Sequence, residues 1–128
     1  MEEKRPRVLI VEDEPLVAVD LESTLTDLGY RVVSKALNLV DGLILAEELD
    51  LDAAVLDINL AGLTSSRIAD VLDRRGVPFL LVTGYTGAGI PVRLRNSLRI
   101  GKPFEESELR HALQDLLGAK APAESLHL

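Results

Sequence analysis

Five polar side chains stand at the ends of short apolar runs, where a parallel sheet would bring them together. They are Glu12, Asp13, Asp57, Thr83 and Lys102. Runs of this kind are typical of strands buried on both faces of a parallel sheet. Functional groups in such sheets gather beyond the carboxyl ends of the strands, near the point where the strand order reverses. The spacing therefore predicts one site built from three carboxylates, a hydroxyl and an ammonium group.

Three carboxylates at one sheet edge need positive charge beside them. Two carboxylates about 4 Å apart repel by roughly 4 kcal/mol at an effective dielectric constant near 20, which is comparable with the stability margin of a small domain. Lys102 supplies one positive charge, and a divalent cation would supply more. Mg²⁺ is favoured because it accepts few carboxylates and keeps several waters. Such a site, with a lysine, a hydroxyl and a projecting carboxylate, suits phosphoryl transfer onto that carboxylate.

Each of these residues also has an ordinary structural explanation. An acidic residue at a strand end is commonly a turn former or a helix cap, Lys102 alone is explained as a solvated surface residue, and Thr83 as a strand former. Gly84 could be glycine only because the chain turns there, although a residue without Cβ also lets a phosphoryl group approach. We favour a functional site because four strand ends carry such groups together. We expect Asp57 to project furthest into solvent.

The apolar runs alternate with segments of helical periodicity. The predicted strands are residues 8–11, 31–36, 53–56, 79–82 and 98–101, spaced as βα units require. With right-handed crossovers, this alternation predicts an α/β fold. We expect a five-stranded parallel sheet of order 2-1-3-4-5 with helices on both faces, which is the flavodoxin-like arrangement.

Helix boundaries are predicted from capping residues. Pro15 suits the first turn of the first helix, and Gly29 stops that helix. Asn38 and Asp41 form a predicted capping pair for the second helix, and Thr64 is the predicted cap of the third. The last helix is predicted over residues 106–117 from its apolar face.

Two segments are predicted to be poorly ordered. Residues 86–97 should hold the fourth helix, but two glycines and Pro91 make that helix short or mobile. Residues 119–128 show no sustained period and are predicted to be a frayed tail. We therefore expect one domain over residues 1–118 followed by a tail over residues 119–128.

Composition excludes several classes of protein. The length of 128 residues and the 47% apolar content fit one domain with a sizeable core. The net charge of -7 disfavours nucleic acid and anionic membrane as partners. The absence of cysteine excludes disulfides and thiolate metal sites. The longest uncharged stretch, residues 76–92, is broken by glycine and proline, so we expect no membrane helix and a cytoplasmic protein.

The sequence resembles a known family. Four motifs carry the resemblance: Val8-Leu9-Ile10-Val11-Glu12-Asp13-Glu14-Pro15, Leu56-Asp57-Ile58-Asn59, Val82-Thr83-Gly84 and Lys102-Pro103-Phe104. They are similar to the motifs of CheY-like receiver domains of two-component response regulators. The resemblance runs from Arg7 to about Leu117 in the family's order.

The resemblance implies a role for each site residue. Asp57 would be the phosphoacceptor, and Glu12, Asp13 and Asp57 would hold Mg²⁺ together with the backbone carbonyl of Asn59. Thr83 would be the switch hydroxyl, and Lys102 would pair with the phosphoryl group. The family usually has a cis peptide at the position of the bond between Lys102 and the following proline.

Three positions depart from the family's pattern. The usual switch aromatic is replaced by Arg99, the usual proline four residues after the phosphoacceptor by Ala61, and a usual glycine by Ser65. Residues 81–85 resemble the signature of FATGUY receivers, which are often single-domain proteins of α-proteobacterial phosphorelays, although its phenylalanine and alanine are absent. Because Arg99 stands at the usual aromatic position, we expect Tyr85, two residues after Thr83, to carry the switch together with residues 86–97. The alternative is that Tyr85 only covers the site and tunes hydrolysis.

The expected function is that of a stand-alone receiver rather than an enzyme. It would take a phosphoryl group from a histidine kinase or histidine phosphotransfer protein and signal by protein contact through the fourth helix, fifth strand and fifth helix. The alternative is a phosphate sink or shuttle without its own output. A nucleotide-binding domain is disfavoured because Gly84, Gly87 and Gly89 do not form the GxGxxG pattern. An aspartyl phosphatase is disfavoured because its aspartate normally follows the first strand and because it needs substrate-binding insertions that are absent from this sequence.

Overall fold

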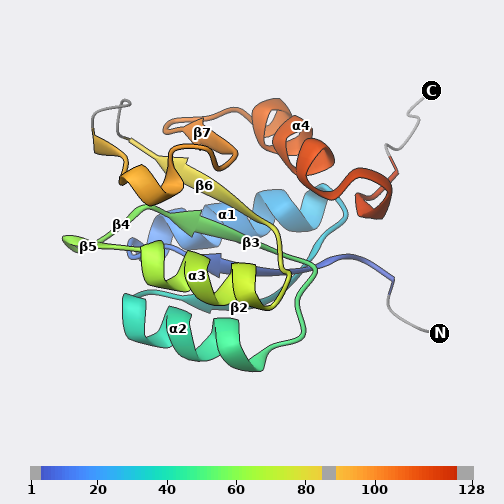
Figure 1. The fold of residues 1–128 in the computed structure, drawn as a ribbon. Helices are drawn as coiled ribbons and strands as arrows, with labels where there is room; N and C mark the ends of the chain where they lie inside the picture. The colour runs from blue at the N-terminus through green and yellow to red at the C-terminus, as the bar shows by residue number, and fades with distance from the viewer. Residues whose placement is uncertain (1–3, 85–88, 124–128) are drawn as a thin grey trace.

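The computed structural model describes residues 4–84 and 89–123, and its centre is a parallel sheet (Figure 1). The sheet contains β1 (Arg7–Val11), β2 (Arg31–Ala36), β3 (Ala53–Asp57), β6 (Phe79–Thr83) and β7 (Arg99–Gly101) in the order β2-β1-β3-β6-β7. This is the predicted order 2-1-3-4-5. The labels differ because two short strands, β4 (Asn59–Leu60) and β5 (Leu63–Thr64), form a separate antiparallel hairpin.

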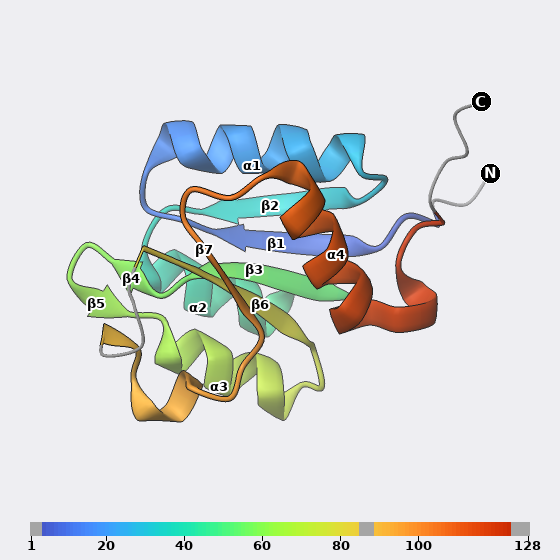
Figure 2. The same ribbon diagram turned by 90° about the horizontal axis from the view of Figure 1, so that it is seen from above.

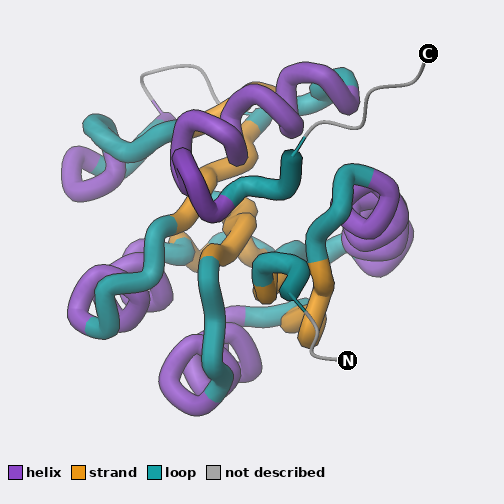
Figure 3. Tube along the Cα trace, turned by 90° about the vertical axis from the view of Figure 1, so that its right-hand side faces the viewer, coloured by secondary structure: helices purple, strands orange, loops and turns teal. Residues whose placement is uncertain are grey.

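Four α-helices cover the two faces of the sheet. They are α1 (Pro15–Asp27), α2 (Leu39–Glu48), α3 (Ser66–Arg74) and α4 (Glu106–Leu117). Helices α1 and α4 pack on one face, and α2 and α3 pack on the other (Figures 2 and 3). Each face has its own aliphatic core, because successive side chains of a strand point to opposite faces. Every residue of β3 and β6 is buried, as expected for central strands.

In its described part, the segment expected to hold a fourth helix contains the 3-10 turn η2 (Val92–Leu94). This agrees with the prediction of a short helix at this position. Ile90 and Leu94 are buried in the core on the α3 side, so the turn is packed onto the sheet. Tyr85 falls in residues 85–88, which lie outside the described residues.

The predicted helix starts are confirmed except for one. Asn38 caps α2, and its side chain accepts a hydrogen bond of 2.8 Å from the N–H of Asp41. Thr64 does not cap α3: it belongs to β5, and Ser65 stands at the N-cap without a side-chain capping bond. The prediction failed because the hairpin extends β5 to Thr64 before the helix begins.

The chain after α4 packs against the domain as far as the structure describes it. A second 3-10 turn, η3 (Gly118–Lys120), follows α4 directly, and Ala121 packs against the core on the α1 side. A Cβ placed on Gly29 would lie 3.0 Å from Cβ of Pro122. The first residues of the predicted tail are therefore ordered, while residues 124–128 lie outside the described part. Within that described part, no helix is long and apolar enough to cross a membrane.

Candidate functional site

Three neighbouring strands bring the predicted residues to one edge of the sheet. In β1 and β3, Val11 pairs with Leu56, so Glu12 and Asp57 follow at the same level of the sheet. Asp57 in turn pairs with Val82, which places Thr83 one residue further along β6. Parallel pairing in this register is why residues far apart in sequence meet at one edge.

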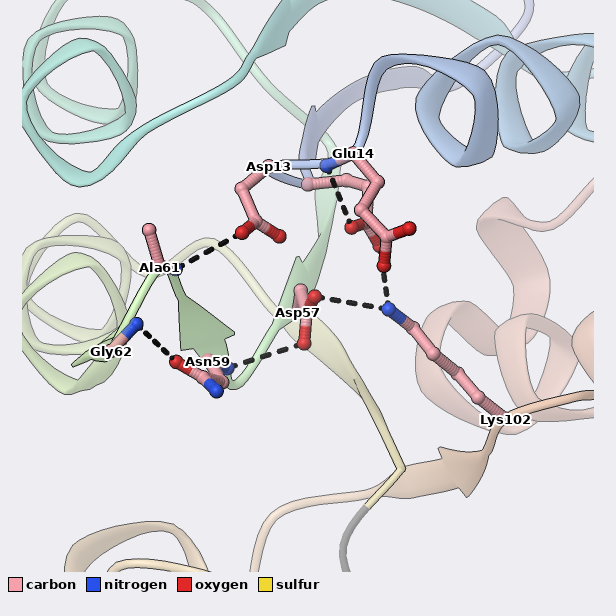
Figure 4. Close-up of polar contacts among 8 residues, drawn as sticks. Asp13, Glu14, Asp57, Asn59, Ala61, Gly62 and Lys102 are labelled. Carbon is pink, nitrogen blue, oxygen red and sulfur yellow. Dashed lines mark hydrogen bonds and ion pairs between the residues drawn. The ribbon is translucent and has the colours of Figure 1, made fainter.

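Lys102 links two of the carboxylates (Figure 4). Its Nζ lies 2.8 Å from Oε1 of Glu12 and 3.0 Å from Oδ2 of Asp57. The backbone N–H of Lys102 donates a hydrogen bond of 2.8 Å to the carbonyl of Thr83, which fixes the start of this side chain relative to β6. The peptide bond between Lys102 and Pro103 is cis, as the resemblance implies.

The acidic cluster consists of Glu12, Asp13 and Asp57. One carboxylate oxygen from each lies within 4.8 Å of the others. Asp57 is 8% exposed and Glu12 is 2% exposed, whereas Asp13 is more open to solvent. The expectation that Asp57 projects furthest into solvent is therefore wrong. It ends a central strand, where neighbouring strands and the Lys102 side chain cover it.

Each carboxylate also accepts a hydrogen bond from a backbone N–H. The donors are Glu14 to Glu12 at 3.1 Å, Asn59 to Asp57 at 3.2 Å and Ala61 to Asp13 at 3.0 Å. Hydrogen bonds from N–H groups favour the charged form of a carboxylate. These hydrogen bonds hold the three carboxylates in place. Lys102 adds its own contacts to Glu12 and Asp57.

Burial and hydrogen bonding act in opposite directions on the charged groups. Burial raises the pKa of Glu12, and the hydrogen bonds from Lys102 and the Glu14 N–H only partly oppose this effect. Burial alone lowers the pKa of Lys102, but its hydrogen bonds to Glu12 and Asp57 outweigh burial, so its pKa lies above the ordinary value. Lys102 therefore stays protonated at neutral pH and remains the cation of the site.

A pocket of about 290 Å³ opens onto this cluster. Its lining consists of Asp13, Glu14, Asp57, Asn59, Ala61, Thr83, Gly84 and Lys102. The clustered oxygen atoms are the hard donors that Mg²⁺ prefers, and the exposure of Asp13 leaves room for water ligands. Glu12, Asp13 and Asp57 therefore fit a magnesium ion. The backbone carbonyl of Asn59 as a further ligand stays a prediction.

The hairpin beside the pocket explains one departure from the family's pattern. Leu60 pairs with Leu63, and the two residues between them have positive φ, 53° at Ala61 and 90° at Gly62. Two positive φ angles are required by a tight type I′ turn. Proline cannot adopt the conformation of Ala61, because its ring holds φ near −65°.

Ala61 is the functional position that the sequence reasoning missed. Its N–H holds Asp13, and the Gly62 N–H donates to the side chain of Asn59 at 2.8 Å. The pair Ala61-Gly62 between two leucines was a weak turn signal, because Ala-Gly is not one of the residue pairs typical of a two-residue hairpin. The turn matters to the site because the Ala61 N–H holds Asp13 of the acidic cluster and the Gly62 N–H holds the neighbouring Asn59.

The remaining predicted residues lie on the β6 side. Thr83 is buried at 3% exposure and, like Gly84, lines the pocket. Apart from its chain neighbours, no heavy atom of the described residues lies within 4 Å of a Cβ placed on Gly84, so these residues leave the space beside it open. Arg99 is exposed and donates to the carbonyl of Arg95 at 2.9 Å, and it does not line the pocket. Arg99 therefore does not fill the site as a buried aromatic residue would.

Comparison with known proteins agrees with this geometry. Residues 8–114 match the family described as response regulator receiver domain. The phyllosphere-induced regulator PhyR of Methylorubrum extorquens is 31% identical over 114 residues, which cover 86% of this chain and 43% of PhyR. This chain thus spans less than half the length of that relative.

Solved structures extend the likeness. The solution structure of SdrG from Sphingomonas melonis Fr1 is 36% identical with a TM-score of 0.79, covering 91% of this chain and 99% of that one. The receiver domain of PhyR from Erythrobacter litoralis is 26% identical with a TM-score of 0.75, covering 95% and 97%. The family match, the fold and the arrangement of acidic residues and lysine agree, and this chain belongs to the response regulator receiver domain family.

Proposed function

We propose that this receiver domain accepts a phosphoryl group on Asp57 from a histidine kinase or a histidine phosphotransfer protein. The observation that carries the proposal is the position of Asp57, whose two carboxylate oxygens are held differently. Oδ2 is bound by Lys102 and Oδ1 by the N–H of Asn59. Asp57 lines a pocket of about 290 Å³, which is large enough for a phosphoryl group.

In the proposed reaction, a carboxylate oxygen of Asp57 attacks phosphorus, and the bond from phosphorus to the donor nitrogen breaks. The donor imidazole leaves with that electron pair, and Asp57 becomes an acyl phosphate. Mg²⁺ held by Glu12, Asp13 and Asp57 would neutralise charge on the phosphoryl oxygens. Lys102, which contacts Glu12 and Asp57, supplies a further positive charge.

Signalling would follow from the new charge. A phosphoryl group brings about two negative charges and strong acceptor oxygens. Lys102 and the hydroxyl of Thr83 offer an ion pair and a hydrogen bond to these oxygens, and Gly84 leaves space for them. The connection after β6 would then be drawn toward the site and would change the surface formed by η2, β7 and α4.

We favour output through protein contacts that depend on phosphorylation. The domain's self-phosphorylation and autodephosphorylation would both depend on Mg²⁺. The alternative is a phosphate sink or shuttle in a phosphorelay. We further propose that this chain acts in a stress response pathway. The support is its 28% identity to the solved structure of the PhyR stress response regulator. Membership of the FATGUY subgroup, the role of Tyr85 as switch aromatic and a cytoplasmic location stay predictions.

Mass spectrometry of the protein after incubation with acetyl phosphate and Mg²⁺ tests the proposal. We expect one added phosphoryl group, which is absent from Asp57→Asn because asparagine keeps the shape and loses the nucleophile. Asp115→Asn, an exposed position on α4, is the matched control and should be labelled normally. Phosphate recovered on Glu12 or Asp13 would refute the assignment. A partner selective for the phosphorylated form would distinguish output from a phosphate sink.

A further inference from the structure

Charge is distributed unevenly over this acidic protein. Residues 66–101 contain six arginines, two aspartates and no lysine or glutamate, which leaves four net positive charges in a chain whose net charge is -7. Helices α1 and α2, beside the opposite edge strand β2, carry acidic residues and no basic ones. The positive charge is therefore concentrated on the α3, η2 and β7 side.

Some of these arginines are already engaged. Arg93 pairs with Asp70 and Asp73 of α3, and Arg74 pairs with Glu47 of α2. Arg75 donates to carbonyls at the end of α2. These contacts hold η2 and α2 against α3, so these three guanidinium groups have structural roles.

Arg95 and Arg99 are different. Both are exposed, and their hydrogen bonds among the described residues go to backbone carbonyls, from Arg95 to Ile90 at 3.4 Å and from Arg99 to Arg95 at 2.9 Å. Within residues 4–84 and 89–123, no carboxylate forms an ion pair with either of them. Both guanidinium groups retain donors for an external carboxylate.

The strand that carries Arg99 has an open outer edge. Leu81 N donates to Leu98 O at 3.0 Å, and Lys102 N donates to Thr83 O at 2.8 Å, so residues 98 and 102 face β6. Because main-chain groups alternate in direction along a strand, the N–H and C=O groups of Arg99 and Gly101 face away from β6. Among the described strands, β7 pairs with β6 alone. A row of this kind is a template for an added strand.

We propose that the outer edge of β7 binds an extended acidic segment of a partner protein. The segment would add as a strand along Arg99 and Gly101, and its carboxylates would pair with Arg95 and Arg99. Val92, 75% exposed, and Leu98, 37% exposed, provide apolar contacts for alternate side chains. Charge complementarity with Arg95 and Arg99 selects an acidic occupant for this edge. The proposal rests on the proposed function, because it names the partner of the output surface.

An NMR titration of the full chain with a short peptide of alternating valine and glutamate tests this proposal. We expect the amide signals of Arg99 and Gly101 to shift most. Arg99→Glu should weaken binding by at least about tenfold, since it removes an ion pair and adds repulsion. Arg31→Glu, at the exposed first residue of the other edge strand, makes the same charge change and should alter binding less than about twofold.

Two further peptides separate strand addition from simple charge attraction. A valine–lysine peptide should not bind, and a valine–glutamate peptide with N-methylated main-chain amides should lose binding because it cannot donate to the strand edge. Three results would each overturn the proposal. The methylated peptide could bind as well as the unmethylated one, or Arg99→Glu and Arg31→Glu could weaken binding equally. The third is preferential binding of a single-stranded oligonucleotide at these arginines. Labelling of Asp57 by acetyl phosphate is measured separately, so its failure is distinguishable from failure of the peptide to bind.

Discussion

Lys102 lies 2.8 Å from the buried carboxylate of Glu12, although ninety positions separate the two residues in the chain. The same ammonium group reaches Asp57 at 3.0 Å. One lysine thus compensates two carboxylates, while the more exposed Asp13 is held by the N–H of Ala61. This division of partners predicts different consequences for removing each charged group.

Replacing Lys102 by methionine should destabilise the domain by about 2 kcal/mol, because Glu12 and Asp57 would remain as uncompensated, largely buried charges. Mg²⁺ should restore part of the loss, since it returns positive charge to the cluster. Urea unfolding followed by circular dichroism, with and without Mg²⁺, measures both effects. Lys35→Met is the matched control: its partner Glu22 is partly exposed, so the loss should stay below about 1 kcal/mol. Equal losses in the two variants would contradict this account of Lys102.

Replacing Asp13 by alanine should weaken Mg²⁺ binding strongly and abolish phosphorylation without unfolding the protein. The variant loses one hydrogen bond from Ala61, but it also loses a like charge beside Glu12 and Asp57, so the metal-free stability should change little. The chain has no tryptophan, so calorimetry or NMR is the suitable measurement of Mg²⁺ affinity. Asp13→Asn serves as a second variant of similar shape. Unchanged affinity in both would rule out this metal site.

The caps of α2 and α3 should respond differently to alanine. Asn38→Ala should cost about 1 kcal/mol, because the side chain accepts the Asp41 N–H. Ser65→Ala should be neutral or slightly stabilising, because the buried Ser65 hydroxyl has no hydrogen-bond partner among the described residues. Chemical denaturation of the two variants provides the comparison. A larger loss for Ser65→Ala than for Asn38→Ala would show that the Ser65 hydroxyl is bonded in solution.

Tyr30 should ionise only at strongly alkaline pH. Burial raises its pKa from 10.0 to about 12. Because the hydroxyl of Tyr30 ionises more easily in the unfolded chain than in the folded protein, the free energy of unfolding falls as the pH rises from 10 through 12. The contribution is fully present below pH 10, and its loss amounts to about 2–3 kcal/mol. The chain has two tyrosines, so the ultraviolet absorbance of Tyr85→Phe reports Tyr30 alone. A midpoint near 10 in the folded protein would contradict the burial of this hydroxyl.

Much of the fold was determined by local sequence pattern. The apolar runs of β1, β3 and β6 predicted buried parallel strands, and the periodicity of residues 106–117 predicted α4 with the boundaries observed. Asp57 and Lys102 were identified because their strand ends must meet wherever parallel strands pair in register. These features depend on the alternation of apolar and polar residues, which is written in the order of the chain.

Tertiary structure alone decided how the site residues share their partners. The burial of Asp57 and the choice of Glu12 rather than Asp13 as the second partner of Lys102 depend on distances across the sheet edge. The start of α3 moved past Thr64 because cross-strand pairing in the hairpin outweighed a local capping preference. The outward edge of β7 likewise follows from which strand lies beside it, since a residue's own type does not determine the direction of its main-chain groups.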